Sequence, residues 1–186
     1  MTDIRRARLT DAAAIGAVHV AAWRSAYPGI LPDEVLTRLS PNRQAGYYDS
    51  MIRAGVGIHV ACIDSRVVGF VSGSVASRKP GLMTPGEGEI ETLYVLDDWR
   101  ERGIGRGLMG AAAAHLAAAG CASLFLWVLR DNPSRWFYER LGGKPTADST
   151  TRVGGSPVIQ RAYVWSPIGK LAQSPRPLPQ PPPHAA

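Results

Sequence analysis

Hydrophobic residues early in the chain recur at helical spacing. Ile15, Val18 and Ala22 lie three or four positions apart, which is typical of one buried helix face. Thr10-Asp11 can cap this helix, which is predicted to run through Trp23. Proline is preorganised for the first position of a helix. Two further helices are therefore predicted, at Pro32–Leu39 and Pro41–Ile52.

The middle of the chain changes to runs that favour β-strands. Val56–Asp64 and Val67–Val75 are rich in β-branched residues and are separated by the polar pair Ser65-Arg66, which predicts a hairpin. The other predicted elements are strands at Ile4–Leu9, Glu89–Val95, Ala122–Leu129 and Pro157–Trp165, helices at 104–119 and 133–141, and a loop over Ser77–Gly88. This mixture of elements predicts an α/β fold.

Length and composition support one globular domain. The chain has 186 residues, of which 45% are hydrophobic and 19% charged, so global disorder is excluded. No window approaches the roughly 20 apolar residues that cross a bilayer, and the charged start of the chain does not resemble a signal peptide. We therefore expect a cytoplasmic protein. Cys62 and Cys121 lie in apolar segments without metal-ligand spacing, so both are expected to be reduced, buried thiols.

The net charge and the proline-rich tail give little indication of a macromolecular partner. The formal net charge of +6 suits an anionic partner, but the basic residues are spread out, so no nucleic acid is expected. Residues 1–169 are assigned to the folded domain, and 170–186 to a proline-rich, disordered tail. A PxxP-type docking peptide is the alternative for the tail. The oligomeric state is left open, a homodimer included.

The segment from Glu89 to Met109 carries the chemistry. A predicted strand leads into the Gly-rich turn Arg100–Gly107 and then into a helix. Free N–H groups at a helix start, with glycines that allow close approach, can bind a phosphate or pyrophosphate. A P-loop is excluded because its Lys and Ser/Thr are missing. Gly105–Gly110 matches G-x-G-x-x-G, so an NAD-linked oxidoreductase is the enzymatic rival, although nine residues separate this match from Val95.

Two motifs resemble one known family. Leu93-Tyr94-Val95 followed by Arg100-x-x-Gly103-x-Gly105 resembles the acetyl-CoA signature of the GNAT superfamily of N-acetyltransferases. The stretch from Asn132 to Gly142, with Tyr138, is similar to the family's next motif, and the likeness extends over about residues 4–165. The resemblance implies a single domain with a curved, mainly antiparallel mixed sheet flanked by helices, and direct acetyl transfer from acetyl-CoA to a primary amine, without a metal.

The resemblance also implies roles for individual residues. The backbone of Leu93, Tyr94 and Val95 would pair with the pantetheine arm, and the Val95 amide would face the thioester carbonyl. The pyrophosphate would bind the turn, and Asn132 would approach the cofactor. The turn residues assigned to cofactor binding are Arg100, Glu101, Arg102, Gly103, Ile104, Gly105 and Arg106. Tyr138 would lie near the cofactor sulfur and protonate the departing thiolate.

The acceptor amine must lose a proton before it attacks, and carboxylates can take it. Alternation along the strand Glu89–Val95 predicts that Glu89, Glu91, Leu93 and Val95 share one face. Glu89 lies six residues before Val95 and is favoured as the base, with Glu91 binding the acceptor's cation. If Glu87 faces the same way, the three acids would raise one another's pKa. The alternative for each is a solvated charge at a strand end. Trp23 and Tyr27 share one helical face and are assigned to the acceptor site, with core packing as the alternative.

The acceptor itself is left open as a small-molecule or protein amine. The non-enzymatic alternative is a CoA-binding regulatory or interaction domain whose tail recruits a partner.

Overall fold

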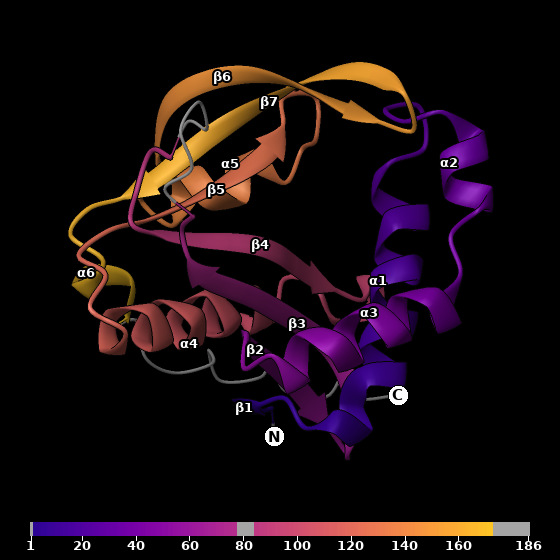
Figure 1. Cartoon of the computed structure of the whole chain (residues 1–186), viewed down its shortest axis with the longest axis horizontal. Helices are drawn as coiled ribbons and strands as arrows, with labels where there is room; N and C mark the ends of the chain where they lie inside the picture. Colours follow the sequence, from indigo (N-terminus) through magenta and orange to yellow (C-terminus); the bar gives the residue numbers. More distant parts are fainter. Residues whose placement is uncertain (1, 78–83, 173–186) are drawn as a thin grey trace, which may run out of the picture.

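The computed structural model describes residues 2–77 and 84–172 as seven strands in one sheet with helices on both faces (Figure 1). The strands run in the order β1-β2-β3-β4-β5-β7-β6. Their bounds are β1 Asp3–Arg6, β2 Gly57–Ile63, β3 Arg66–Val75, β4 Gly88–Val95, β5 Leu124–Leu129, β6 Lys144–Val153 and β7 Ser156–Trp165. All neighbouring strands are antiparallel except the parallel pair β4 and β5. The expected mixed, mainly antiparallel sheet is thereby confirmed.

The helices divide between the two faces of the sheet. Their bounds are α1 Ala12–Ala26, α2 Asp33–Thr37, α3 Pro41–Arg53, α4 Ile104–Ala118, α5 Arg135–Arg140 and α6 Gly169–Ala172. Ile15 and Val18 of α1 and Tyr48 of α3 pack with Phe70 of β3 on one face. The other face is covered by α4, which buries Leu108, Met109 and Leu116 against the sheet. Each helix thus buries one apolar stripe, as the helical spacing predicted.

Strands β4 and β5 pair only at their beginnings. Their parallel register runs from Gly88–Leu124 to Ile90–Leu126 and then stops. Beyond this point the two strands separate, and the second half of β4 has a pairing partner only in β3. The resulting gap in the middle of the sheet opens at the carboxyl ends of both strands.

A β-bulge in β4 changes which side chains share a face. Ser72 pairs with Thr92 but Gly73 pairs with Ile90, so Glu91 is an extra residue without a partner in β3. Strict alternation predicted that Glu89, Glu91, Leu93 and Val95 share one face, and this prediction is wrong because the bulge reverses the alternation. Ile90, Leu93 and Val95 all pack in the α4 cluster. Glu89, next to Ile90, lies on the α1 side.

The sequence prediction missed strand β6. Its sequence KPTADSTTRV has few apolar residues, and alternate side chains are exposed because β6 is the edge strand of the sheet. Strand β6 pairs with β7 along almost its whole length, and the two form a long hairpin turned by Gly154 and Gly155, both at positive φ. This hairpin forms one wall of the cavity described below.

The end of the described chain extends the domain slightly. The boundary between 169 and 170 falls inside helix α6, and Leu171 of α6 is 3% exposed and packs in the α4 cluster. Residues 173–186 of the expected tail, and 78–83 of the expected loop, lie outside the described residues. Both cysteines are free and buried, as expected. Within residues 2–77 and 84–172, no helix has the length and apolarity to span a membrane.

Candidate active site

The second half of β4 presents to the gap backbone groups that β3 does not use. In an antiparallel pair of strands, hydrogen-bonded and non-hydrogen-bonded residue pairs alternate. The Leu96 amide donates to the Val68 carbonyl at 2.9 Å, so the next pair, Gly69 and Val95, is not hydrogen-bonded. Val95, and Leu93 two residues earlier, therefore point their N–H and C=O groups away from β3. These groups face the gap, where the Arg100 Nε–H donates to the Val95 carbonyl at 3.5 Å and a ligand can pair with the other three groups.

Tyr94 has the opposite orientation. Its backbone belongs to the hydrogen-bonded pair with Phe70, so its N–H and C=O are used within the sheet. Its side chain lies on the α1 side, where the Trp23 indole N–H donates to the Tyr94 hydroxyl at 2.8 Å. Of the three residues assigned to the pantetheine arm, Leu93 and Val95 thus offer backbone groups, and Tyr94 contributes a side chain to the opposite face.

The N-terminus of α4 opens beside the same gap. Gly103 is the N-cap residue with φ of 77°, and no side chain caps the helix there. The amides of Ile104, Gly105 and Arg106 belong to the first turn and have no acceptor within the helix. A Cβ on Gly105 would lie 3.1 Å from the Phe137 ring, so a larger residue would crowd this approach. The arrangement forms a cradle that suits an anion such as pyrophosphate.

The arginines of the turn play unequal parts. Arg100 lines the cavity and forms an ion pair with Asp97 at 2.8 Å. The guanidinium of Arg102 stacks on the Trp99 ring, 4.9 Å from its centroid, so its side chain is held outside the cavity. Arg106 and the backbone-strained Glu101, with φ of 61°, also line the cavity. Ile104 instead buries its side chain in the α4 core, which leaves only its amide for a ligand.

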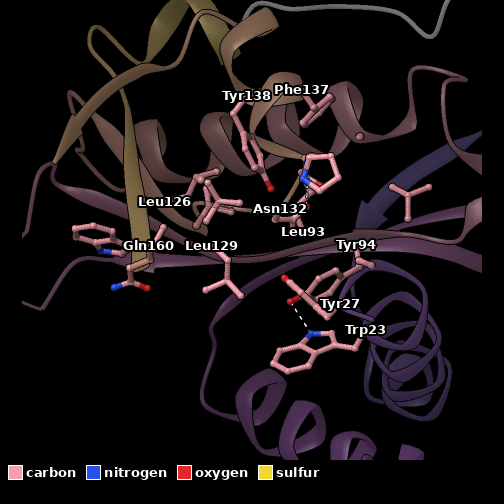
Figure 2. Close-up of a pocket in the computed structure, with 18 of the residues that line it drawn as sticks. Trp23, Tyr27, Leu93, Tyr94, Leu126, Leu129, Asn132, Phe137, Tyr138 and Gln160 are labelled. Carbon is pink, nitrogen blue, oxygen red and sulfur yellow. Dashed lines mark hydrogen bonds between the residues drawn. The ribbon is translucent and has the colours of Figure 1, made fainter. Parts of the chain in front are cut away.

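A cavity of about 730 Å³ joins the gap to the first turn of α4. Figure 2 shows Phe137 and Tyr138 on one side of the gap and Trp23 and Tyr27 on the other. Asn132 lies between them, where its side-chain oxygen accepts a hydrogen bond from the Ser134 amide at 2.8 Å. The cavity therefore passes through the sheet and is reached from both faces.

Tyr138 is held by α5 with its hydroxyl directed into the cavity (Figure 2). The residue is 8% exposed, and no hydrogen bond to its hydroxyl occurs among the described residues. Burial, with a smaller contribution from Tyr27, raises the pKa of Tyr138 above its usual value. The phenol therefore stays protonated at neutral pH and is available as a proton donor.

The carboxylates of β4 lie on the α1 side of the gap. Glu91 lines the cavity and is exposed, and its carboxylate accepts a hydrogen bond from the Ser74 hydroxyl at 2.9 Å. Glu89 is partly buried and is not among the cavity residues. Burial and the charge of Glu91 raise the pKa of Glu89. Glu87 turns away and accepts a hydrogen bond from the Ala122 amide at 2.6 Å, so the expected group of three acids is a pair.

Aromatic side chains form the α1 wall of the cavity. Trp23 and Tyr27 meet edge to face with ring centroids 4.9 Å apart, and burial raises the pKa of the Tyr27 hydroxyl. His19 stacks behind Trp23 at 5.3 Å. Burial lowers the pKa of His19 to about 4, so this imidazole is neutral at physiological pH and supports the wall.

Comparison with known proteins agrees with this geometry. Residues 20–143 match the acetyltransferase (GNAT) family. The chain belongs to the GNAT family. The sequence is 30% identical over 173 residues to the uncharacterized N-acetyltransferase YuaI of Bacillus subtilis, with 92% of this chain and 96% of that protein covered. The resemblance drawn from the two sequence motifs is therefore confirmed, together with the enzyme class, an acyl-CoA-dependent N-acetyltransferase.

Solved structures share the GNAT fold of this chain. The putative acetyltransferase yncA from Salmonella typhimurium, solved with acetyl-CoA, has a TM-score of 0.67 at 20% identity, with 89% of this chain and 94% of that one covered. The PaiA N-acetyltransferase of Thermoplasma acidophilum, solved with coenzyme A, has a TM-score of 0.63 at 19% identity and covers 87% and 98%. At these identities the likeness establishes the fold.

Several residues of this GNAT cavity were missing from the sequence prediction. They lie mostly on β5 and on the β6–β7 hairpin, and they are Leu31, Trp127, Leu129, Arg140, Thr151, Val153 and Gln160. The β-branched residues Thr150, Thr151 and Val153, directly before the Gly154-Gly155 turn, are the signal that could have identified the hairpin. These cavity residues lie far in sequence from the acetyl-CoA motif, so the motif did not indicate that they line the site.

Proposed function

We propose that this protein transfers the acetyl group of acetyl-CoA to a primary amine by direct attack in a ternary complex. The observation that carries the proposal is the gap between β4 and β5. Backbone groups of Leu93 and Val95 that β3 does not use face this gap beside the uncapped start of α4. One anion-binding cradle and one extended strand edge, side by side, suit a ligand with a pyrophosphate at one end and an amide-containing arm at the other.

The two ends of acetyl-CoA are assigned to separate groups of atoms. The amides of Ile104, Gly105 and Arg106, with the Arg106 guanidinium, bind the pyrophosphate. The backbone groups of Leu93 and Val95 pair with the amides of the pantetheine arm. The Val95 amide is also placed to donate to the thioester carbonyl oxygen, where negative charge develops during attack.

The amine approaches from the α1 face. Glu91 lines the cavity there and binds the amine in its ammonium form. Glu89, with its raised pKa, accepts the proton through a water molecule, because it is close to Glu91 but does not line the cavity. A raised pKa makes a carboxylate a stronger base, which suits removal of a proton from an ammonium group.

Tyr138 acts from the opposite face. Glu89 first takes one proton from the ammonium group, which leaves a neutral amine. The amine nitrogen then bonds to the thioester carbon, the C–S bond breaks, and the nitrogen loses its second proton to water. The Tyr138 hydroxyl donates its proton to the departing thiolate and regains one from water. The acid and the base thus stand on opposite sides of the gap, which keeps them from neutralising each other.

Turnover of acetyl-CoA with a panel of primary amines tests the proposal. We expect release of free thiol, together with an acetylated amine that mass spectrometry detects. Binding of CoA without turnover on any amine would instead support a regulatory CoA-binding domain. Binding of NADH in preference to CoA would support the oxidoreductase reading of Gly105–Gly110.

A further inference from the structure

On the α1 face, the β6–β7 hairpin closes the end of the cavity next to α2 and leaves the cavity open beside the exposed Glu91. Strand β5 ends opposite Gln160 of β7, and the rest of the hairpin continues beyond it towards α2 (Figure 1). At the tip, a Cβ on Gly154 would lie 2.2 Å from a methyl carbon of Val35 in α2. The hairpin tip is thus in close contact with α2 and spans the acceptor side of the gap.

Apolar packing holds the hairpin against α1 and the segment that leads into α2. Val153 and Val158 of the hairpin and Leu129 of β5 pack against the buried residues Tyr27 and Leu31. We call the space enclosed by Trp23, Tyr27, Leu31, Leu129, Val153 and Gln160 the acceptor chamber. Its walls are aromatic and aliphatic, which favours the burial of an apolar group.

The charged residues that line the cavity differ between its two sides. Glu91 is the acidic side chain on the α1 side of the cavity lining. The basic lining residues, Arg100, Arg106 and Arg140, belong to the α4 turn and to α5, on the cofactor side. Among the described residues that line the cavity, then, none on the α1 side offers a cation to an acidic group of an acceptor. A carboxylate buried there without a partner would be strongly disfavoured.

We propose that the acceptor is a compact amine with an apolar body and no acidic group, so that amino acids and protein chains are excluded. This inference rests on the acetyl transfer proposed above and specifies its substrate class. The ammonium binds at Glu91, where the cavity is open to solvent, and the apolar body lies against Trp23, Leu129 and Val153. A peptide would need room for further residues where the hairpin contacts α2.

Three probes separate charge from size. 2-Phenylethylamine carries the apolar body alone, phenylalanine adds a carboxylate, and Phe-Gly-Gly-amide adds length without a carboxylate. We expect kcat/KM for 2-phenylethylamine to exceed that for either other probe by at least about tenfold, the effect of one unpaired polar group. Equal or better turnover of phenylalanine or the peptide overturns the inference and leaves acetyl transfer intact. Spermidine serves as a fourth probe, a polyamine without an apolar ring, and its acetylation without that of 2-phenylethylamine also overturns the inference. If no amine is acetylated, the proposed function itself is rejected.

A charge added inside the chamber should reverse the preference. Gln160→Lys places a cation in the lining, and we expect it to raise kcat/KM for phenylalanine and lower it for 2-phenylethylamine. Ile159→Lys is the matched control, because Ile159 precedes Gln160 on β7 and is 38% exposed on the other face. The same change in selectivity in both variants, or no change in either, contradicts the proposal that the acceptor binds in the chamber.

A disulfide can test whether the hairpin must open. The Cβ of a residue at 154 would lie 3.6 Å from the Cβ of Val35, which is within the range of disulfide bonds. In the variant Val35→Cys with Gly154→Cys, we expect 2-phenylethylamine to be acetylated equally fast in the oxidised and the reduced forms, since it enters beside Glu91. Loss of turnover on oxidation, restored on reduction, would show that acceptors enter under the hairpin and would overturn the assignment.

Discussion

Removal of the Tyr138 hydroxyl separates a catalytic role from a packing role. Tyr138→Phe keeps the ring in the α4 cluster, where Tyr138 packs near Tyr163 and Trp165. Because the Tyr138 hydroxyl has no hydrogen-bond partner among the described residues, its loss should change the free energy of unfolding by less than about 0.5 kcal/mol. A thiol of pKa about 8.5 leaves tolerably as a thiolate at neutral pH, so the phenol contributes moderately. We expect kcat to fall by about 10- to 100-fold, or about 1.4 to 2.7 kcal/mol in activation free energy, with acetyl-CoA affinity within a few-fold.

Tyr163→Phe is the matched control in the same cluster. The Tyr163 hydroxyl donates to Glu139 at 2.6 Å, so this variant should lose about 1 kcal/mol of stability and keep its kcat. Steady-state kinetics at saturating acceptor and urea unfolding on both variants give the comparison. Equal kcat values for Tyr138→Phe and the parent would refute the general-acid role. A fall in kcat in both variants would show that the effect comes from packing.

Four further predictions address the cofactor, the base, the fold and the tail. Gly103→Val should weaken acetyl-CoA binding in calorimetry, whereas Gly120→Val, at positive φ at the other end of α4, should cost similar stability and leave affinity unchanged. Glu89→Gln should lower kcat by about 10²- to 10⁴-fold at neutral pH and less at high pH, where the amine is already deprotonated; pH–rate profiles that overlay the parent would exclude it as the base. Folding lowers the pKa of His19 from 6.5 to about 4, so the free energy of unfolding should decrease as the pH drops through this window. His19→Gln should make the decrease between pH 7 and pH 4.5 smaller by on the order of 1 to 2 kcal/mol, as measured by urea unfolding at both pH values. Deletion of residues 174–186 should leave the melting temperature and turnover within error, and a large loss would show that these residues belong to the domain.

The strand–turn–helix unit that we assign to the cofactor could be predicted from sequence because its geometry is local. Gly103 and Gly105 set the turn and the helix start within a few residues, and Leu93 and Val95 lie on the strand that leads into it. Short-range spacing is sufficient to identify such a strand–turn–helix unit.

The acceptor side could not be predicted in the same way, because its geometry depends on contacts that are distant in sequence. The bulge at Glu91 arises from pairing with β3 and reversed the expected faces of β4. Strand β6 gains its place only by pairing with β7, and its exposed edge position leaves a weak hydrophobic pattern. Thr151 and Gln160 therefore became visible as cavity residues only in the folded chain.

Hydrogen–deuterium exchange with and without acetyl-CoA tests the central claim most directly. If the thioester arm lies in the gap between β4 and β5, the amides of Leu93 and Val95 and those of the first turn of α4 should exchange more slowly on binding, because they gain acceptors. The Tyr94 amide, already bonded within the sheet, should change little and serves as the internal control. Protection confined to another region, with Leu93, Val95 and the α4 amides unchanged at saturating acetyl-CoA, would contradict the assignment of this gap as the acetyl-transfer site.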